Sequence, residues 1–285
     1  MHDSGVKKAL MLVAVALVAL AIAAAAGLAG AAWMGERRVA RTVEVRVVPV
    51  PYTRDAAALK QGKHLFESRG CAQCHGADGR GIAIDVEPWL PARPWGAERI
   101  EIRSPNITRG DGGVVSDYNE GDWVRAIRHG VNPKGHALMF MPSDAYNRMH
   151  DRDLAALVAY VRSLAPVAGE SATLALPLLF KVEYGLGLVN DAADRIDHRK
   201  PPPLAIAPAP TQAFGVYLAP LCTTCHGETI ASMQRYDTLD KFVAMMRTGK
   251  RADGAAIDPA MPFVALRNLD DVELAALYAH FRGRR

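Results

Sequence analysis

The chain has little of what several protein classes require. Aromatic residues make up only 7% of its 285 residues, and four cysteines are too few for a disulfide-dense secreted scaffold. Lysine and arginine (34) barely exceed aspartate and glutamate (30), and the resulting formal charge of +4 is too small for a nucleic-acid-binding surface. We therefore expect no nucleic-acid partner. Half of the residues are hydrophobic, which excludes a disordered chain.

One long stretch near the N-terminus contains no charged side chain. It runs from Ala9 to Met34, and as a helix it would be about 39 Å long, enough to cross a hydrocarbon core of about 30 Å. A cleavable signal peptide has a shorter apolar region of about 7–15 residues. We therefore predict that residues 1–36 form an uncleaved, single-pass membrane anchor. Cleavage within the small-residue stretch 27–32 is the alternative.

Proline content divides the rest of the chain. Residues 37–55 have an extended character and are predicted to be a tether. Residues 166–210 include the run Pro201-Pro202-Pro203, and this density of proline favours an extended polyproline spacer, so we predict a Pro-rich linker there. Two segments remain, 56–165 and 211–285, which we predict to be separate domains.

The two segments repeat one pattern. Met141-Pro142 and Leu154-Ala155-Ala156-Leu157 recur as Met261-Pro262 and Leu274-Ala275-Ala276-Leu277, 120 residues later in both cases. Internal repetition with the same element order indicates two copies of one domain. The apolar spacing is helical, helices are also expected at 56–68 and 119–129, and no segment predicts a strand with confidence. The expected fold class is therefore all-α.

Each segment carries one Cys-x-x-Cys-His motif. These are Cys71, Cys74 and His75 in the first, and Cys222, Cys225 and His226 in the second. A zinc ribbon needs its cysteine pairs about 15–20 residues apart, and a thioredoxin-type motif needs a βαβ context, neither of which is present. The motif is typical of c-type haem attachment, with two thioethers to the porphyrin and the histidine on the iron. We predict two covalently bound haem c groups.

Covalent haem predicts the side of the membrane. Such haem is attached on the outer face of the bacterial inner membrane, so both domains are expected in the periplasm. Lys7 and Lys8 precede the apolar run, whereas Arg37, Arg38, Arg41 and Arg46 follow it. This distribution alone would place the C-terminal side in the cytoplasm, and the haem argument overrules it.

Methionine is the expected sixth ligand of each iron. Met141 and Met261 are the candidates, because each precedes a proline and lies 13 residues before an amphipathic helix at an equivalent place in the repeat. Met139 is the main alternative to Met141. His129 and His136 are weaker alternatives, interpreted as exposed or loop histidines. His150 is expected to cap a helix, and His198 to be a surface or packing residue.

These motifs together resemble class I cytochrome c domains. The longer first segment, with Ser104-Pro105-Asn106-Ile107-Thr108, also resembles membrane-anchored bacterial dihaem cytochromes c linked to dehydrogenases. The resemblance implies an N-terminal transmembrane helix followed by two cytochrome c-like domains. It implies an electron-transfer protein, not an enzyme, working between a dehydrogenase or quinol donor and a terminal oxidase or other cytochrome. A dihaem subunit of a haem-copper oxidase and a dihaem peroxidase are the alternatives.

Overall fold

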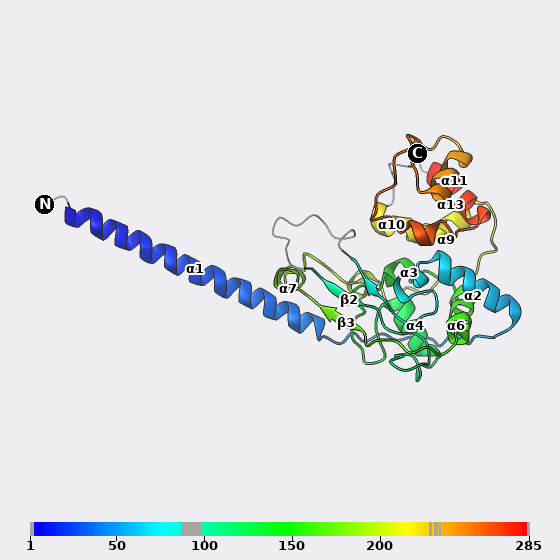
Figure 1. Cartoon of the computed structure of the whole chain (residues 1–285), viewed down its shortest axis with the longest axis horizontal. Coiled ribbons are helices and arrows are strands. Elements are labelled where there is room, and N and C mark those ends of the chain that lie inside the picture. Colours follow the sequence, from blue (N-terminus) through cyan, green and yellow to red (C-terminus); the bar gives the residue numbers. More distant parts are fainter. Residues whose placement is uncertain (1–2, 87–98, 228–229, 231–232, 234, 284–285) are drawn as a thin grey trace. The chain divides into compact units, whose positions relative to one another are not determined.

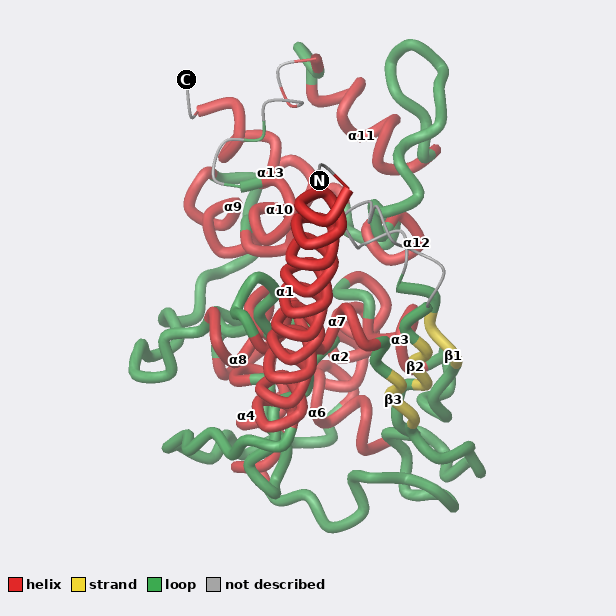
Figure 2. The backbone as a smooth tube through the Cα atoms, turned by 90° about the vertical axis from the view of Figure 1, so that its left-hand side faces the viewer, coloured by secondary structure: helices red, strands yellow, loops and turns green. Residues whose placement is uncertain are grey.

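The computed structural model describes residues 3–86, 99–227, 230, 233 and 235–283, and its fold is mostly helical, as predicted (Figures 1 and 2). The chain divides into two compact units. Unit 1 comprises Met1–Arg41 and Leu176–Asn190, and unit 2 comprises Thr42–Ala175 and Asp191–Arg285. Unit 2 contains both Cys-x-x-Cys-His motifs. We call residues 56–165 its first lobe and residues 211–285 its second lobe.

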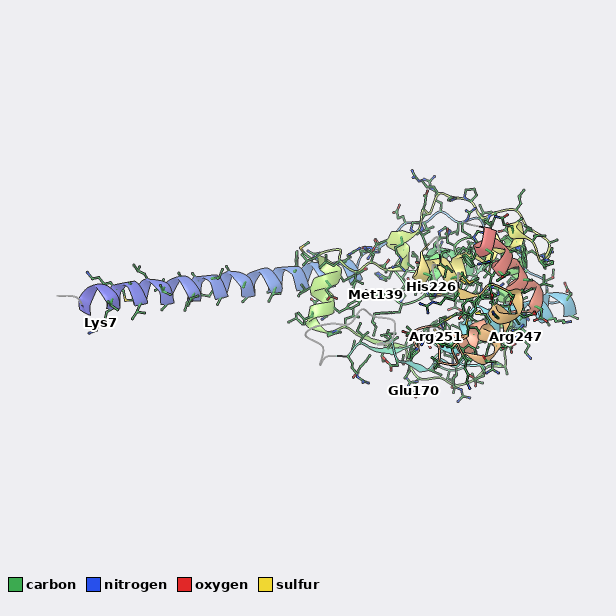
Figure 3. The ribbon with its side chains drawn as sticks, turned by 90° about the horizontal axis from the view of Figure 1, so that it is seen from above. Lys7, Met139, Glu170, His226, Arg247 and Arg251 are labelled. Atoms are coloured by element: carbon green, nitrogen blue, oxygen red, sulfur yellow. The ribbon has the colours of Figure 1, made fainter. Side chains whose placement is uncertain are left out.

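Unit 1 is built on one long helix, α1 (Asp3–Val39). Lys7 lies near its start (Figure 3). Residues Gly5–Val39 are long and apolar enough to cross a membrane, and the most apolar window is not buried by the rest of the chain. The helix continues beyond the predicted anchor at 1–36, with Arg37 and Arg38 in its last turn, where basic side chains complement the helix dipole. A short helix, α7 (Leu178–Gly185), completes the unit.

The first lobe is held together by helices at its two ends. Helix α2 (Ala56–Ser68) begins at Asp55, whose side chain accepts a hydrogen bond from the Ala58 N–H at 2.9 Å. It packs against α6 (Asp151–Ser163) through a core that includes Leu65 and Leu154. A Cβ atom on Gly62 would lie 2.0 Å from the carbonyl oxygen of Ala156. The close approach of the two backbones therefore requires glycine.

Three shorter helices lie between α2 and α6 in the sequence. They are α3 (Cys71–His75), α4 (Glu120–His129) and α5 (Ser143–Tyr146). Helix α4 begins with a capping box in which Asn119 and Asp122 satisfy each other's backbone N–H groups. Helix α6 is capped by His150, whose Nδ1 accepts from the Asp153 N–H at 3.2 Å. The predicted helices at 56–68 and 119–129 and the predicted cap are thus present.

The second lobe repeats this order of elements. Its helices are α9 (Gln212–Leu218), α10 (Pro220–His226), α11 (Leu239–Thr248), α12 (Phe263–Leu266) and α13 (Asp271–Gly283). Helices α9 and α13 pack as α2 and α6 do. Here a Cβ on Gly215 would lie 2.1 Å from the carbonyl oxygen of Ala276. The same glycine-dependent crossing therefore occurs in both lobes.

No segment of the sequence predicts a strand with confidence, but the structure contains a small antiparallel sheet. Strands β1 (Ala83–Ile84), β2 (Glu101–Arg103) and β3 (Thr173–Ala175) lie in the order β1-β2-β3, with Ile102 opposite both Ile84 and Leu174. Strands of two or three residues are too short to show a period-2 pattern, which explains why no strand was predicted.

The predicted linker is not uniformly extended. Strand β3, helix α7 and helix α8 (Ala192–Arg195) all lie within residues 166–210, and α8 is capped by Asp191. The proline run at 201–203 belongs to no helix or strand. Proline density therefore indicated the extended part of this segment but did not reveal the helices before it.

Candidate functional site

A cavity of about 440 Å³ lies in the first lobe. Its lining includes Cys71, Cys74, His75 and Met141, so the structure brings together all four residues predicted for this lobe. Met139 also lines it, so both candidate methionines lie at the cavity. Most of the wall is apolar, from helix α4, strands β2 and β3 and the loops between them, including Ile102, Ile107, Ile127, Leu138 and Leu174.

The two cysteines of the first motif have neutral thiols. Burial raises the pKa of Cys71 to about 12 and also raises the pKa of Cys74. A thiolate is the form that binds metal directly or attacks a disulfide. Thiols held in this apolar wall are poorly suited to that chemistry. They are suited to thioether bonds, which carry no charge.

His75 is oriented by a backbone carbonyl. Its Nδ1 lies 3.0 Å from the Pro105 carbonyl oxygen, so Nδ1–H donates and Nε2 keeps its lone pair. Burial lowers the pKa of His75, which favours the neutral imidazole that binds iron. Ser104 Oγ donates to the Cys74 carbonyl at 2.6 Å. Ser104 and Pro105 therefore fix both the motif helix and its histidine, a role that the sequence alone does not reveal.

The residues present fit a haem group. The indole N–H of Trp123, which lines the cavity, is buried without a hydrogen-bond partner among the described residues. A buried polar group without a partner in a native fold calls for an explanation. Arg69 and Arg103 line the same cavity. An apolar ring carrying two carboxylates would match the apolar wall, use the free indole donor and lie near Arg103, whose present partner Glu170 is exposed, whereas Arg69 is already paired with Glu273.

The second lobe carries the corresponding residues. Cys222, Cys225 and His226 lie on α10, and Met261 directly precedes the Pro262 cap of α12. Cys222 and Met261 pack against the same hydrophobic core, and burial raises the pKa of Cys222 to about 12. Cys225 and His226 are exposed, and His226 is labelled in Figure 3. Residues 228–229, 231–232 and 234, which follow the motif, lie outside the described part of the chain.

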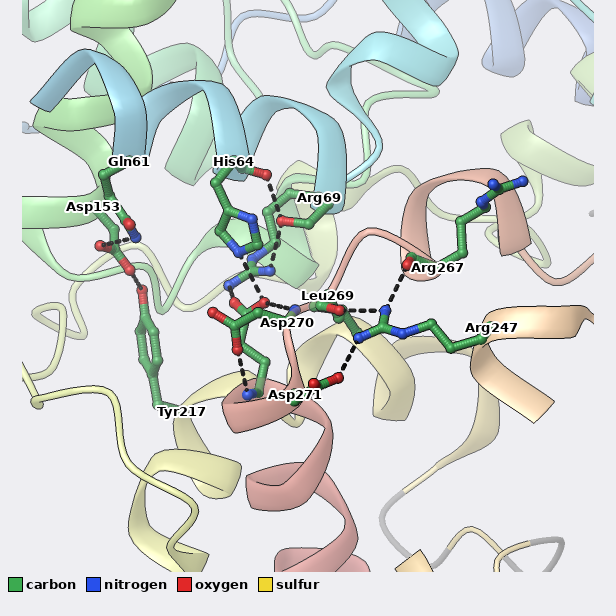
Figure 4. Close-up of polar contacts among 12 residues, drawn as sticks. Gln61, His64, Arg69, Asp153, Tyr217, Arg247, Arg267, Leu269, Asp270 and Asp271 are labelled. Carbon is green, nitrogen blue, oxygen red and sulfur yellow. Dashed lines mark hydrogen bonds and ion pairs between the residues drawn. The ribbon is translucent and has the colours of Figure 1, made fainter. Parts of the chain in front are cut away.

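The two lobes contact each other reciprocally (Figure 4). His64 on α2 bonds Glu273 at the start of α13, with Nε2 2.8 Å from Oε2. In return, Tyr217 on α9 donates to Asp153 at the start of α6 at 2.7 Å. The motif helices follow the same rule, because α3 packs near α12 and α10 near α5. The helix that carries each Cys-x-x-Cys-His motif thus contacts the helix that follows the Met-Pro pair of the other lobe.

A buried ion pair lies at this contact. Arg69, two residues before Cys71, donates to Glu273 Oε1 at 2.6 Å, and both side chains are 5% exposed. Burial opposes ionisation of Glu273, but the charge of Arg69 and the hydrogen bonds from His64 and Arg69 outweigh it and lower the pKa of Glu273 to about 2. The place of Glu273 in the sequence indicates only an acidic side chain in the first turn of a helix. Its partners are about 200 residues away in the sequence, so no local pattern could reveal them.

The prediction that His129 is an exposed or loop histidine is wrong. His129 is the last residue of α4 and is buried, and its Nδ1 lies 3.0 Å from Nδ1 of His198. Burial, with His198 and nearby arginines, lowers the pKa of His129 to about 4. His198 in turn reaches the Ala193 carbonyl, also at 3.0 Å, so it packs against α8 as a structural residue. Neither histidine, nor His136, is among the residues lining the cavity.

Comparison with known proteins agrees with this geometry. The cytochrome c family profile matches residues 59–165. The chain is 26% identical over 274 residues to the fructose dehydrogenase cytochrome subunit of Gluconobacter japonicus, covering 82% of this chain and 54% of that protein. It is 29% identical over 187 residues to the gluconate 2-dehydrogenase cytochrome c subunit of Pantoea cypripedii, covering 62% and 40%.

A third relative belongs to an oxidase. The cbb3-type cytochrome c oxidase subunit CcoP of Helicobacter pylori (strain 52) is 27% identical over 133 residues, covering 46% of this chain and 36% of that protein. The chain thus spans about half the length, or less, of these relatives. Residues 59–165 are a cytochrome c domain, an electron-transfer module that carries covalent haem c, and the chain is homologous to the cytochrome c subunits of dehydrogenases.

Proposed function

We propose that the chain is a membrane-anchored dihaem cytochrome c that transfers electrons on the periplasmic side of a bacterial inner membrane. Its donor would be a dehydrogenase or a quinol, and its acceptor a terminal oxidase or another cytochrome. The observation that carries the proposal is the reciprocal packing of α3 near α12 and α10 near α5. This packing brings the two attachment motifs to one interface, as a one-electron relay between two haems requires.

The side chains have separable roles in this proposal. Cys71 and Cys74 would hold the first haem and Cys222 and Cys225 the second, and the imidazoles of His75 and His226 and the thioethers of Met141 and Met261 would bind the irons. The iron supplies the one-electron redox chemistry when bound. The chain orients His75 through Pro105, excludes water from the cavity with apolar walls, and places the Trp123 donor and Arg69 at its lining.

Dehydrogenase-linked function is favoured over the alternatives. The dehydrogenase subunits align over 82% and 62% of the chain, against 46% for the oxidase subunit. A dihaem peroxidase needs one iron with an open or displaceable sixth position. The placement of Met141 at the cavity, with Met261 at the equivalent position, instead supports methionine side chains that would close both irons to other ligands.

Haem counting tests the proposal. We expect two haems per chain by pyridine haemochrome assay of the purified holoprotein. The double variant C71S/C74S should retain one haem, and C222S/C225S should retain one as well, because each pair of thioethers serves a separate group. One haem in the unaltered protein, or loss from only the first-lobe variant, would contradict the dihaem proposal while leaving the cytochrome c domain in place.

Substituting each of the two cavity methionines tests which of them binds the first haem iron. Met141→Ala should lower the reduction potential of the first haem and abolish its Met–Fe charge-transfer band, because a thioether ligand raises the potential. Met139→Ala, the matched control on the same loop, should leave both unchanged. The measurement is a spectroelectrochemical titration. The reverse pattern would transfer the ligand assignment to Met139.

A further inference from the structure

Helix α7 is held tightly against the C-terminal end of α1. Ala31, Ala32 and Val182 form a small buried cluster between the two helices. A Cβ on Gly35 would lie 2.0 Å from the Lys181 carbonyl oxygen, and one on Gly185 would lie 2.2 Å from the Ala31 carbonyl oxygen. Small residues at a helix crossing allow the backbones this close approach. Helix α7 is therefore fixed at residues 31–35 of α1.

The basic residues that follow the apolar run strengthen this contact. Arg38 donates to the carbonyl oxygens of Tyr184 and Val189 and to the side chain of Asn190, and its guanidinium lies 4.4 Å from the centre of the Tyr184 ring. Arg41 donates to the Tyr184 hydroxyl. In the sequence, Arg38 and Arg41 are only two of the basic residues that follow the apolar run. In the structure, they attach residues 176–190 to the end of α1.

The position of the contact along α1 determines how deep α7 would lie in the membrane. Residues 31–35 lie at the end of the uncharged run Ala9–Met34. As a helix that run is about 39 Å long, longer than a hydrocarbon core of about 30 Å, so its last turn reaches the headgroup boundary. Trp33 is exposed there, with Arg37 4.8 Å from its ring centre. This pairing is typical of a membrane–water interface.

The α7 segment exposes apolar side chains at this level. Leu178 is 54% exposed, Leu186 56% and Leu188 73%. We infer that residues 178–188 form a second membrane contact, in which the edge of a phospholipid bilayer covers these leucines. The occupant is lipid because the leucines continue the apolar surface of α1 at the boundary that α1 itself defines. This inference rests on the proposed membrane anchor.

Cysteine accessibility in the full-length holoprotein tests the inference. Single variants Leu186→Cys and Leu188→Cys are reconstituted into phosphatidylcholine–phosphatidylglycerol vesicles and treated with a water-soluble PEG-maleimide. The native cysteines are expected to form thioether bonds to haem, so only the new thiol should react with the maleimide. Leu204→Cys in the proline-rich segment, where Leu204 is 93% exposed, is the matched control. We expect modification at 186 and 188 to be on the order of tenfold slower than at 204, because lipid suppresses the thiolate.

A third position separates this inference from the anchor on which it depends. Leu20→Cys lies in the middle of α1 and should be protected if α1 spans the membrane. Protection at 20 together with rapid modification at 186 and 188 would overturn the α7 contact alone. Rapid modification at all positions would overturn the anchor as well. A disulfide-linked dimer of the Leu186→Cys protein after mild oxidation would assign the leucines to a second copy of the chain and overturn the lipid contact.

Discussion

Replacing Glu273 with glutamine should lower the free energy of unfolding of unit 2 by about 3–5 kcal/mol, because it leaves the buried guanidinium of Arg69 without a counter-charge. Glutamine keeps the size of the side chain and can still accept from the Asp270 N–H, as Glu273 does at 2.9 Å, so the helix cap survives. The substitution therefore removes the negative charge of Glu273 and leaves the helix cap in place. Guanidinium-induced unfolding of the holoprotein, followed by far-UV circular dichroism, measures the effect.

Asp271→Asn provides the matched control for this charge. Asp271 is the neighbouring acid on the same helix and bonds Arg247 at 2.7 Å, but it is 87% exposed (Figure 4). Solvent-exposed ion pairs contribute about 1 kcal/mol or less. A loss for Glu273→Gln no larger than that for Asp271→Asn would show that the Arg69–Glu273 pair does not hold the lobes together.

The pH dependence of the same variant gives a second readout. The pKa of Glu273 is lowered from its ordinary value of 4.5 to about 2 in the folded chain. Its contribution is therefore fully present above about pH 4.5 and is lost as the pH falls toward 2. The difference in unfolding free energy between the unaltered protein and Glu273→Gln should shrink across that range. A difference that stays constant would indicate that a packing defect, and not the charge, causes the loss.

Alanine at Gly62 should destabilise the first lobe by about 1–3 kcal/mol or more, although alanine favours helix by about 1 kcal/mol over glycine. The new Cβ would lie 2.0 Å from the Ala156 carbonyl oxygen and 2.6 Å from Cβ of Tyr160. Neither contact can be relieved by a side-chain rotation, because one atom belongs to the backbone and the other is attached to it. Helices α2 and α6 would have to separate. Thermal unfolding of the holoprotein should show the loss.

Two further substitutions serve as comparisons for Gly62→Ala. Gly215→Ala meets Ala276 at 2.1 Å in the second lobe and should cause a loss of similar size. Gly283→Ala, near the end of α13, meets only the Gln212 side chain, at 3.3 Å, and should change stability by less than about 0.5 kcal/mol. If Gly62→Ala behaves like Gly283→Ala, the close crossing of α2 and α6 does not limit stability.

The sequence predicted the elements whose signals are local. The helix at 56–68 coincides with α2, because Asp55 is a standard cap and the apolar spacing that follows is helical. The residues Cys71, Cys74, His75 and Met141 were predicted from motif chemistry, and they line one cavity. The family comparison confirms the cytochrome c domain and the mostly helical fold.

Features that depend on distant parts of the chain were not predictable in this way. Arg69 and Glu273 meet only after two lobes have folded and packed, and the pairing of His129 with His198 requires α8 to lie against the first lobe. The orientation of His75 depends on a backbone carbonyl, that of Pro105, which no side-chain pattern encodes. In each case the residues are visible in the sequence, but the sequence does not show which of them contact each other.

The exchange of contacts between the lobes has an evolutionary consequence. A two-fold, self-complementary interface is the kind that identical subunits form. A single-lobe ancestor with such a face could already have paired with its twin, and duplication with fusion would have preserved that pairing within one chain. The two copies differ at the position two residues before the first motif cysteine, which is Arg69 in one copy and Pro220 in the other. Only the first copy thus has a cation to bury at this position.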